Sequence, residues 1–268
     1  ITRIGKGAVS RCSSLTSVTI PNSVTSIGEY AFQNCRDLTS VTIPNSVNTI
    51  GEYAFEYCES MTSVTMGSGV TSIDQYAFSN CTGLTRVNIS DLSAWCNIDF
   101  GNLTSNPLNY AKYLYLDGVL VEDIIIPADM TEVKPYVFAK CEKLKSVTMP
   151  DGVTSIGRYA FRGCSGLTNI TIPDEVTSIG EYAFYVCTGL TSITIPAKVT
   201  SIGTYAFSNC TSLKEVYCKP IAPPVGAPSM FSINASGRQI YVPTDSVEAY
   251  QGASEWSIYA KKIVGYNF

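Results

Sequence analysis

Apolar and polar positions recur along this chain with a period of 23 residues, as from Cys35 to Cys58. A typical period holds a Leu or Met, an alternating pair of β-branched residues, a second apolar pair, an Ala-Phe step and a Cys. A fixed period in the twenties is typical of a solenoid, in which each coil packs only on its neighbours. The cysteine that marks the period stands at Cys12, Cys35, Cys58, Cys81, Cys141, Cys164, Cys187 and Cys210.

The first half of a period predicts a short strand. Leu38, Val41 and Ile43 follow an L-x-x-L-x-L spacing. The alternation of Val41 and Ile43 with Thr42 places apolar side chains on one face and small hydroxyls on the other. Pro44 ends the strand because proline has no backbone donor for the ladder. Strands of successive periods are expected to pair in parallel.

The second half of a period predicts a short strand and a turn. Val47 and Ile50 indicate the strand, and Ala54 with Phe55 indicates a helical or 3-10 turn that points to the core. Gly51 is expected to need positive φ. Tyrosine precedes the Ala-Phe step in most periods, and we expect its ring to lie outside, stacked on the tyrosines of neighbouring coils.

The pattern C-x-x-L-T-S-V-T-I-P-x-x-V-T-S-I-G-x-Y-A-F resembles the BspA-type leucine-rich repeat of bacterial surface proteins, over nearly the whole chain. The resemblance implies a leucine-rich repeat-like solenoid of right-handed coils. It implies a parallel sheet on one face, with short strands and 3-10 or helical turns on the other. It also implies an exported or surface-attached protein that acts in adhesion or protein binding, without specifying the ligand.

The regular period is interrupted between Cys81 and Cys141. We expect one irregular, oversized coil at 90–120. Its end, from Tyr113 to Val121, reads as a hairpin with Asp117-Gly118 as a two-residue turn.

The repeat decays after residue 217. A proline-rich stretch leads to an expected strand at Gln239–Pro243, and Thr244–Ser246 offers a helix N-cap. Because terminal repeats must cover the open end of a solenoid core, we read 218–268 as a capping segment. The predicted organisation is one continuous domain, with a solenoid at 1–217 and this cap.

Composition excludes several classes of protein. The net charge is −4 and no run of Lys or Arg occurs, so a nucleic-acid footprint is absent. No stretch approaches the ~18 consecutive apolar residues of a membrane span. No signal peptide is found in this chain, which opens in mid-repeat. An extracellular or cell-surface location is therefore expected from the resemblance alone.

The chain offers little for catalysis or metal binding. It contains no histidine, so Ser/His/Asp and Cys/His arrangements cannot form. The repeated cysteines are expected to form a ladder of reduced, buried thiols, because parallel side chains do not converge as a disulfide requires. We expect no enzyme, no cofactor and no metal site.

Two surfaces are candidates for ligand binding. The outward strand positions carry hydroxyls, and the oversized coil concentrates aromatic residues that either form a binding ledge or fill the gap where regular coils part. Thr also suits an exposed strand for purely structural reasons. The candidate residues are Ser63, Thr65, Arg86, Asn88, Trp95, Tyr110, Tyr113, Tyr115, Ser146 and Thr148.

The sequence thus predicts a non-enzymatic, cell-surface or secreted repeat protein that mediates protein–protein interaction or adhesion. Its partner would be a host or bacterial surface protein, and the chain is expected to be a monomer. Two alternatives stay open. One is a carbohydrate-binding module that uses hydroxyls and aromatic rings to hold a glycan. The other is a passive spacer within a larger surface protein.

Overall fold

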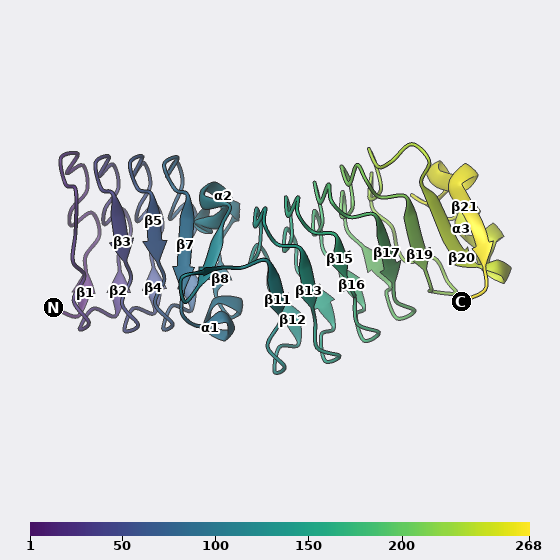
Figure 1. The fold of residues 1–268 in the computed structure, drawn as a ribbon, viewed down its shortest axis with the longest axis horizontal. Helices are drawn as coiled ribbons and strands as arrows, with labels where there is room; N and C mark the ends of the chain where they lie inside the picture. Colours follow the sequence, from purple (N-terminus) through teal and green to yellow (C-terminus); the bar gives the residue numbers. More distant parts are fainter. The chain divides into compact units, whose positions relative to one another are not determined.

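The computed structural model describes residues 1–268, which form two compact units. Unit 1 is Ile1–Val121 with Ala139–Cys141, and unit 2 is Glu122–Phe138 with Glu142–Phe268. Within each unit the chain winds in successive coils whose strands lie side by side (Figure 1). The predicted repeat fold with parallel sheets is confirmed. The division into a solenoid at 1–217 and a cap at 218–268 stays a prediction.

Unit 1 contains two sheets, which correspond to the two strands predicted for each period. The first has the order β1-β2-β4-β6-β8 and is parallel throughout. Its strands are Arg3–Ile4, Ser26–Ile27, Thr49–Ile50, Ser72–Ile73 and Asp99–Phe100. The second has the order β10-β9-β7-β5-β3, and its strands are Val119–Leu120, Leu114–Leu116, Arg86–Ile89, Ser63–Thr65 and Ser40–Thr42.

Unit 2 contains three sheets. One has the order β11-β13-β15, with strands Asp123–Ile125, Ser146–Thr148 and Asn169–Ile170. Another has the order β12-β14-β16-β18, with strands Glu132–Val133, Ser155–Ile156, Ser178–Ile179 and Ser201–Ile202. The third has the order β17-β19-β20-β21, with strands Ser192–Ile195, Glu215–Cys218, Gln239–Pro243 and Ile263–Tyr266.

The parallel register repeats the sequence period. Ser40 pairs with Ser63 and Val41 with Val64, so equivalent side chains of neighbouring coils lie next to each other. The inward positions are consequently filled by the same residue type from coil to coil. Phe32, Phe55 and Phe78 are buried and stacked with ring centroids 5.2 Å apart. The equivalent Phe side chains of unit 2 are also buried and stacked, with centroids 5.1–5.7 Å apart.

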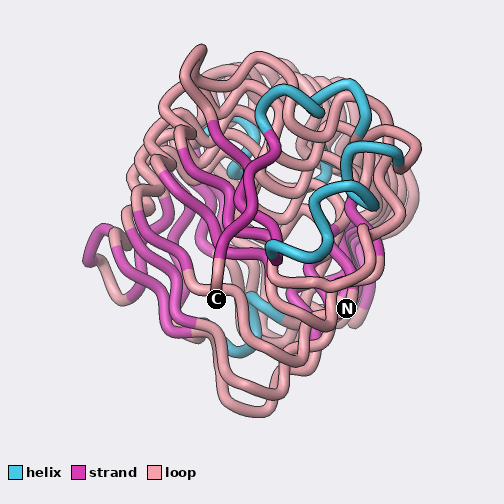
Figure 2. Tube along the Cα trace, turned by 90° about the vertical axis from the view of Figure 1, so that its right-hand side faces the viewer, coloured by secondary structure: helices cyan, strands magenta, loops and turns pink.

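The turn segment between the second strand and the cysteine consists of successive turns in place of the helical or 3-10 turn that the sequence predicts. The N–H groups of Ala54, Glu56 and Cys58 donate to the carbonyls three residues before them, as in successive β-turns. The alternate N–H groups, of Tyr53, Phe55 and Tyr57, donate instead to carbonyls of the next coil. Every second donor therefore serves coil-to-coil pairing, and no helix forms. Turns and loops accordingly make up much of each coil (Figure 2).

Positive φ falls on the tyrosines of the turn segment and not on the glycine before it. Tyr53 has φ 54°, while Gly51 lies outside the left-handed region, so that expectation was wrong. Glycine is needed at position 51 because an added Cβ would lie 2.6 Å from the backbone nitrogen of Glu29 in the preceding coil. The predicted stacking of the outer tyrosines is confirmed, with Tyr30, Tyr53 and Tyr76 rings 5.0–5.1 Å apart.

The end of unit 1 is formed by the oversized coil. It contains helix α1 (Leu92–Cys96), the 3-10 turn η1 (Leu103–Ser105) and helix α2 (Leu108–Ala111). The predicted hairpin is confirmed, since β10 pairs antiparallel with β9 and Leu116 lies opposite Val119. Asp117 and Gly118 both have positive φ, as a two-residue turn of this kind requires.

The end of unit 2 contains the 3-10 turn η2 (Thr244–Ser246), helix α3 (Val247–Gly252) and the 3-10 helix η3 (Ser257–Lys262). The predicted strand at Gln239–Pro243 is confirmed as β20. The predicted N-cap is wrong in its chemistry, because no side-chain hydrogen bond caps the first residues of η2 or α3. Helix α3 instead follows directly on η2, and its Tyr250 is fully buried.

Candidate ligand-binding surfaces

Threonine hydroxyls fall into two groups in this structure. Those just before the strands, such as Thr39, Thr62 and Thr85, donate to a backbone carbonyl of the preceding coil at 3.1–3.2 Å. The hydroxyls on the strands themselves, such as Thr42 and Thr65, are exposed and have no hydrogen-bond partner in the protein. The first group stabilises the stack of coils, whereas the second is available to a ligand.

The strand face of unit 1 ends in a small cluster made by Arg86, Asn88 and Tyr115. The Arg86 guanidinium lies 4.2 Å from the centroid of the Tyr115 ring, and its Nε donates to Asn88 Oδ1 at 3.0 Å. Asn88 in turn donates to the Val64 carbonyl. We call these three side chains the Arg86 cluster. They are half-buried and held in place by each other, so they form a pre-organised group beside the free hydroxyls.

Three other predicted residues of unit 1 have different positions. Tyr113 is half-buried just before β9 and follows the same alternation as Tyr115, with buried Leu114 between them. Tyr110 is a structural residue, because its hydroxyl accepts the backbone N–H of Asn80 at 2.9 Å. Trp95 is 1% exposed and packs on Phe100, so it cannot offer its ring to a ligand. For Tyr110 and Trp95, the structure therefore supports the alternative that aromatic side chains fill the gap where the regular coils part.

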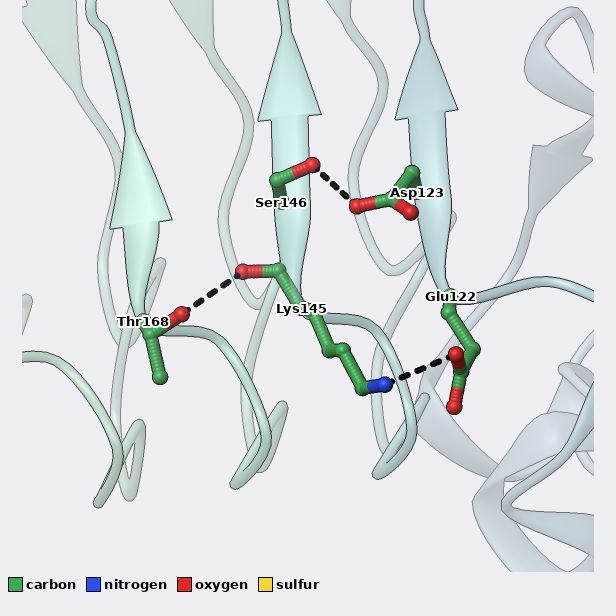
Figure 3. A network of polar contacts seen from close by, with 5 residues as sticks. All are labelled: Glu122, Asp123, Lys145, Ser146 and Thr168. Carbon is green, nitrogen blue, oxygen red and sulfur yellow. Dashed lines mark hydrogen bonds and ion pairs between the residues drawn. The ribbon is translucent and has the colours of Figure 1, made fainter.

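The remaining predicted residues, Ser146 and Thr148, lie on β13 of unit 2. Ser146 donates to Asp123 Oδ1 at 2.5 Å, and beside it Lys145 forms an ion pair with Glu122 at 2.8 Å (Figure 3). The Ser146 hydroxyl is therefore already hydrogen-bonded to a side chain of the neighbouring strand β11. Thr148 is exposed and has no partner in the protein, like the free hydroxyls of unit 1.

The strand face of unit 2 carries an aromatic cluster that the sequence did not predict. Tyr217 stacks on Tyr241 at 4.8 Å, and Tyr266 meets both rings edge-on at 5.4 and 5.6 Å. The signal that could have found it is local: the outward positions of β19 and β20 carry tyrosine where regular coils carry Ser or Thr.

The cysteine ladder is buried and chemically quiet. The thiols of Cys58, Cys81, Cys187 and Cys210 each donate to a phenylalanine carbonyl of the preceding coil at 3.1–3.3 Å. Burial raises the pKa of Cys81 and of Cys210 to about 12, so both stay protonated at neutral pH. The predicted buried, reduced state is confirmed for these coils, whereas Cys12 of the first coil is exposed.

Short parallel strands and turns repeated every 23 residues define a leucine-rich repeat solenoid. The model of the "BspA type Leucine rich repeat region" matches residues 1–105 and 110–222 in six copies, and the chain belongs to this family. None of the curated proteins matches the chain. No helix is long and apolar enough to cross a membrane.

Solved structures of bacterial leucine-rich repeat proteins are similar to this chain. A leucine-rich repeat protein from Bacteroides ovatus is 26% identical with a TM-score of 0.55, and the match covers 84% of this chain and 63% of that one. This chain therefore spans less than two thirds of that protein's length. The pneumococcal vaccine antigen PcpA is 18% identical with a TM-score of 0.54, and the match covers 100% of this chain and 84% of that one.

Proposed function

We propose that this chain is a non-enzymatic protein of the bacterial cell surface or secreted medium, whose strand face in unit 1 binds a protein partner. The observation that carries the proposal is the Arg86 cluster, which lies at one end of a row of unpaired strand hydroxyls. Arg and Tyr are enriched among the residues that dominate binding energy at protein interfaces. A cluster held by internal contacts also loses little freedom on binding.

The charge of the surface agrees with this role. Ser40, Thr42, Ser63 and Thr65 are uncharged, and Arg86 is the one charged side chain on the outward positions of β3, β5 and β7. Affinity would therefore come from contact area and the Arg–Tyr anchor more than from long-range steering by charge. We expect binding to depend only weakly on salt concentration.

The test begins with immobilised, purified extracellular-matrix proteins and bacterial surface proteins. Once a binder is found, Arg86→Glu combined with Tyr115→Ala should weaken binding at least tenfold, while the melting temperature stays nearly unchanged. Thr171→Arg, at an exposed position directly after β15 in unit 2, serves as the matched control and should bind normally. Full binding by the double variant would refute this surface. Loss caused by Thr171→Arg alone would move the site to unit 2.

A further inference from the structure

The free donors of Arg86 show which chemical group the strand face of unit 1 is suited to bind. The guanidinium uses one N–H group inside the protein, since Nε donates to Asn88 Oδ1 at 3.0 Å. The N–H groups on its two terminal nitrogens have no hydrogen-bond partner in the protein. They form a planar fork, which binds a carboxylate through two parallel hydrogen bonds.

The positive charge of Arg86 is not neutralised within the protein. Elsewhere, lysines form ion pairs with glutamates 23 residues away, at the equivalent position of a neighbouring coil, as in Lys6–Glu29, Lys145–Glu122 and Lys198–Glu175. The residue opposite Arg86 on β5 is Ser63, which carries no charge. Arg86 forms no ion pair, so its charge is available to a carboxylate of another molecule.

The Tyr115 ring holds the fork in place and reduces its contact with water. The guanidinium lies 4.2 Å from the ring centroid, and Arg86 is half-buried. Because the effective dielectric constant is lower there than in bulk water, a carboxylate would be attracted more strongly than at a fully exposed arginine. A single contact of this kind acts at short range, which agrees with the weak salt dependence expected for the whole surface.

The fork has apolar side chains on one side and hydroxyls on the other. Leu120 of β10 lies directly opposite Tyr115 of β9, and opposite residues of an antiparallel pair share one face of the sheet. Tyr113 follows the same alternation as Tyr115, and Leu120 and Tyr113 are both half-buried. On the other side, Thr65 of β5 lies opposite Asn88, and its hydroxyl is unpaired.

We propose that the Arg86 cluster binds an aspartate or glutamate side chain in an extended segment of the protein partner, beside an aliphatic residue of that segment. The carboxylate accepts two hydrogen bonds from the Arg86 fork. The aliphatic side chain packs on Leu120 and Tyr113, and the backbone of the segment bonds to the Thr65 hydroxyl. A side-chain carboxylate is favoured over a terminal one because the face continues on both sides of Arg86, and a chain end would cover only one side.

This inference rests on the proposed function, because it names the part of the partner that the same surface recognises. Its test uses peptides and needs no identified partner, so the two proposals can fail separately. The inference alone is wrong if the peptides show no preference for the carboxylate, while Arg86→Glu with Tyr115→Ala still loses a protein partner. The proposed function alone is wrong if the preference is found, while that double variant binds the protein partner fully.

The experiment compares two peptides that differ only in the acidic group, N-acetyl-Leu-Glu-Leu-amide and N-acetyl-Leu-Gln-Leu-amide. Each is titrated into the isotope-labelled full chain, and NMR follows the side-chain N–H signals of Arg86. The Glu peptide should shift these signals and bind at least fivefold more tightly than the Gln peptide. Its dissociation constant should be on the order of 1–10 mM, as befits so small a ligand.

Three results would overturn the proposal. They are equal affinities of the two peptides, binding that leaves the Arg86 signals unchanged, and no detectable binding of either peptide. A third peptide, N-acetyl-Leu-Leu, carries only a terminal carboxylate and should bind more weakly than the Glu peptide. Tighter binding of this peptide would contradict the assignment to a side-chain carboxylate.

Variants then assign the contact. Arg86→Gln removes the charge and should abolish the preference for the Glu peptide. Arg86→Lys keeps the charge but loses the planar fork, so it should retain only part of the preference. Arg36→Gln, at an exposed position of unit 1 outside the strands, is the matched control and should keep the full preference. An unchanged preference in Arg86→Gln, or its loss in Arg36→Gln, would overturn the proposal.

Discussion

The segments that close the two units meet the same requirement by different means. In a regular turn segment three N–H groups donate to the next coil, so the last coil of a stack needs acceptors from elsewhere. In unit 1 they come from three different sources. Tyr76 donates to the Asn102 side chain, Phe78 to the Thr104 carbonyl and Asn80 to the Tyr110 hydroxyl.

In unit 2 the backbone hydrogen bonds between turn segments continue for one more segment. Tyr205, Phe207 and Asn209 still donate to backbone carbonyls, at Pro228, Met230 and Ser232. The residues 227–232 thus form one more, irregular turn segment, in which Phe231 stacks on Phe207 at 5.4 Å. At this segment a side chain replaces the backbone carbonyl as acceptor, since the Phe231 N–H donates to the Tyr259 hydroxyl at 3.2 Å.

Both closing segments therefore use a buried tryptophan and a tyrosine hydroxyl. Trp95 and Trp256 are each no more than 1% exposed, and Trp256 also donates to the Pro224 carbonyl at 2.8 Å. The comparison teaches that aromatic residues gathered at a break in a repeat can be terminators of the stack. Aromatic residues that stay on the strand face, such as Tyr115 and Tyr217, are better candidates for ligand contacts.

The largest effect that tests this comparison is removal of the buried rings. Trp95→Ala and Trp256→Ala should each lower the free energy of unfolding by ~3–5 kcal/mol, the usual loss for a large buried aromatic. Urea unfolding followed by circular dichroism measures both. If Trp95→Ala left stability unchanged, the closing role of the oversized coil would be wrong.

A second effect depends on pH. Cys218 lies in the closing region of unit 2, 3.4 Å from the Tyr250 hydroxyl, and burial raises the pKa of this thiol to about 12. An unfolded thiol ionises with a pKa of about 8.5. The free energy of unfolding is therefore unaffected by Cys218 below that pH, and it falls as pH rises from about 8.5 toward 12, because only the unfolded thiol ionises there. At pH 10 the loss from Cys218 alone should be about 2 kcal/mol.

The measurement is the urea midpoint at pH 7.5 and pH 10 for the parent and for Cys218→Ala. The other buried thiols and the tyrosines titrate in both proteins, so the difference between the two pH slopes isolates Cys218. A steeper decline in the parent is expected. Identical slopes would mean that Cys218 is not protected from water in the folded state.

A third effect separates the two tyrosine hydroxyls. Tyr259→Phe leaves the buried N–H of Phe231 without an acceptor and should cost ~1–3 kcal/mol. Tyr110→Phe affects a partly buried N–H, of Asn80, and should cost about 1 kcal/mol or less. Faster amide hydrogen exchange at these two residues should accompany the losses. Equal exchange rates in parent and variants would show that neither hydroxyl is needed.

The smallest effect is expected on the strand face. Tyr115→Ala removes a half-buried ring that contacts Arg86, and it should cost less than ~1 kcal/mol. Tyr115 and Trp95 come from the same oversized coil, so the contrast between their two alanine variants is direct. Similar losses at both positions would remove the distinction between terminator and surface residue.

The regular coil could be predicted from the sequence because each position repeats. The inward Val, Ile, Leu, Phe and Cys residues and the hairpin at Asp117-Gly118 follow from periodicity and turn chemistry. The turn segment is a run of β-turns in place of the predicted helical or 3-10 turn, because alternate N–H groups donate to the next coil, and the sequence of one coil does not specify those partners. Local propensity is a weak guide where tertiary pairing supplies the partners.

The candidate surface could be predicted only in part. Arg86 and Asn88 stood out because they replace Ser and Thr on a strand, and the structure brings Tyr115 to them. Trp95 and Tyr110 were proposed for their residue type, which says nothing about burial. The Tyr217 cluster depends on rings from β19, β20 and β21, whose alignment is outside the regular period.

The spacing of coil-to-coil contacts has an evolutionary consequence. In the regular coils, ring stacks, Ser–Ser register pairs and the threonine hydrogen bonds join residues 23 positions apart, as from Ser40 to Ser63 or Thr39 to Thr62. The other coil-to-coil hydrogen bonds also keep a fixed spacing, of 22 residues in the turn segment and 26 at the cysteines. Duplication or deletion of one such stretch of the gene would leave every remaining coil with the same contacts to the coils on both sides. The number of coils can therefore change by recombination without new core packing, while the two terminators and the tyrosines of the strand face are inherited intact.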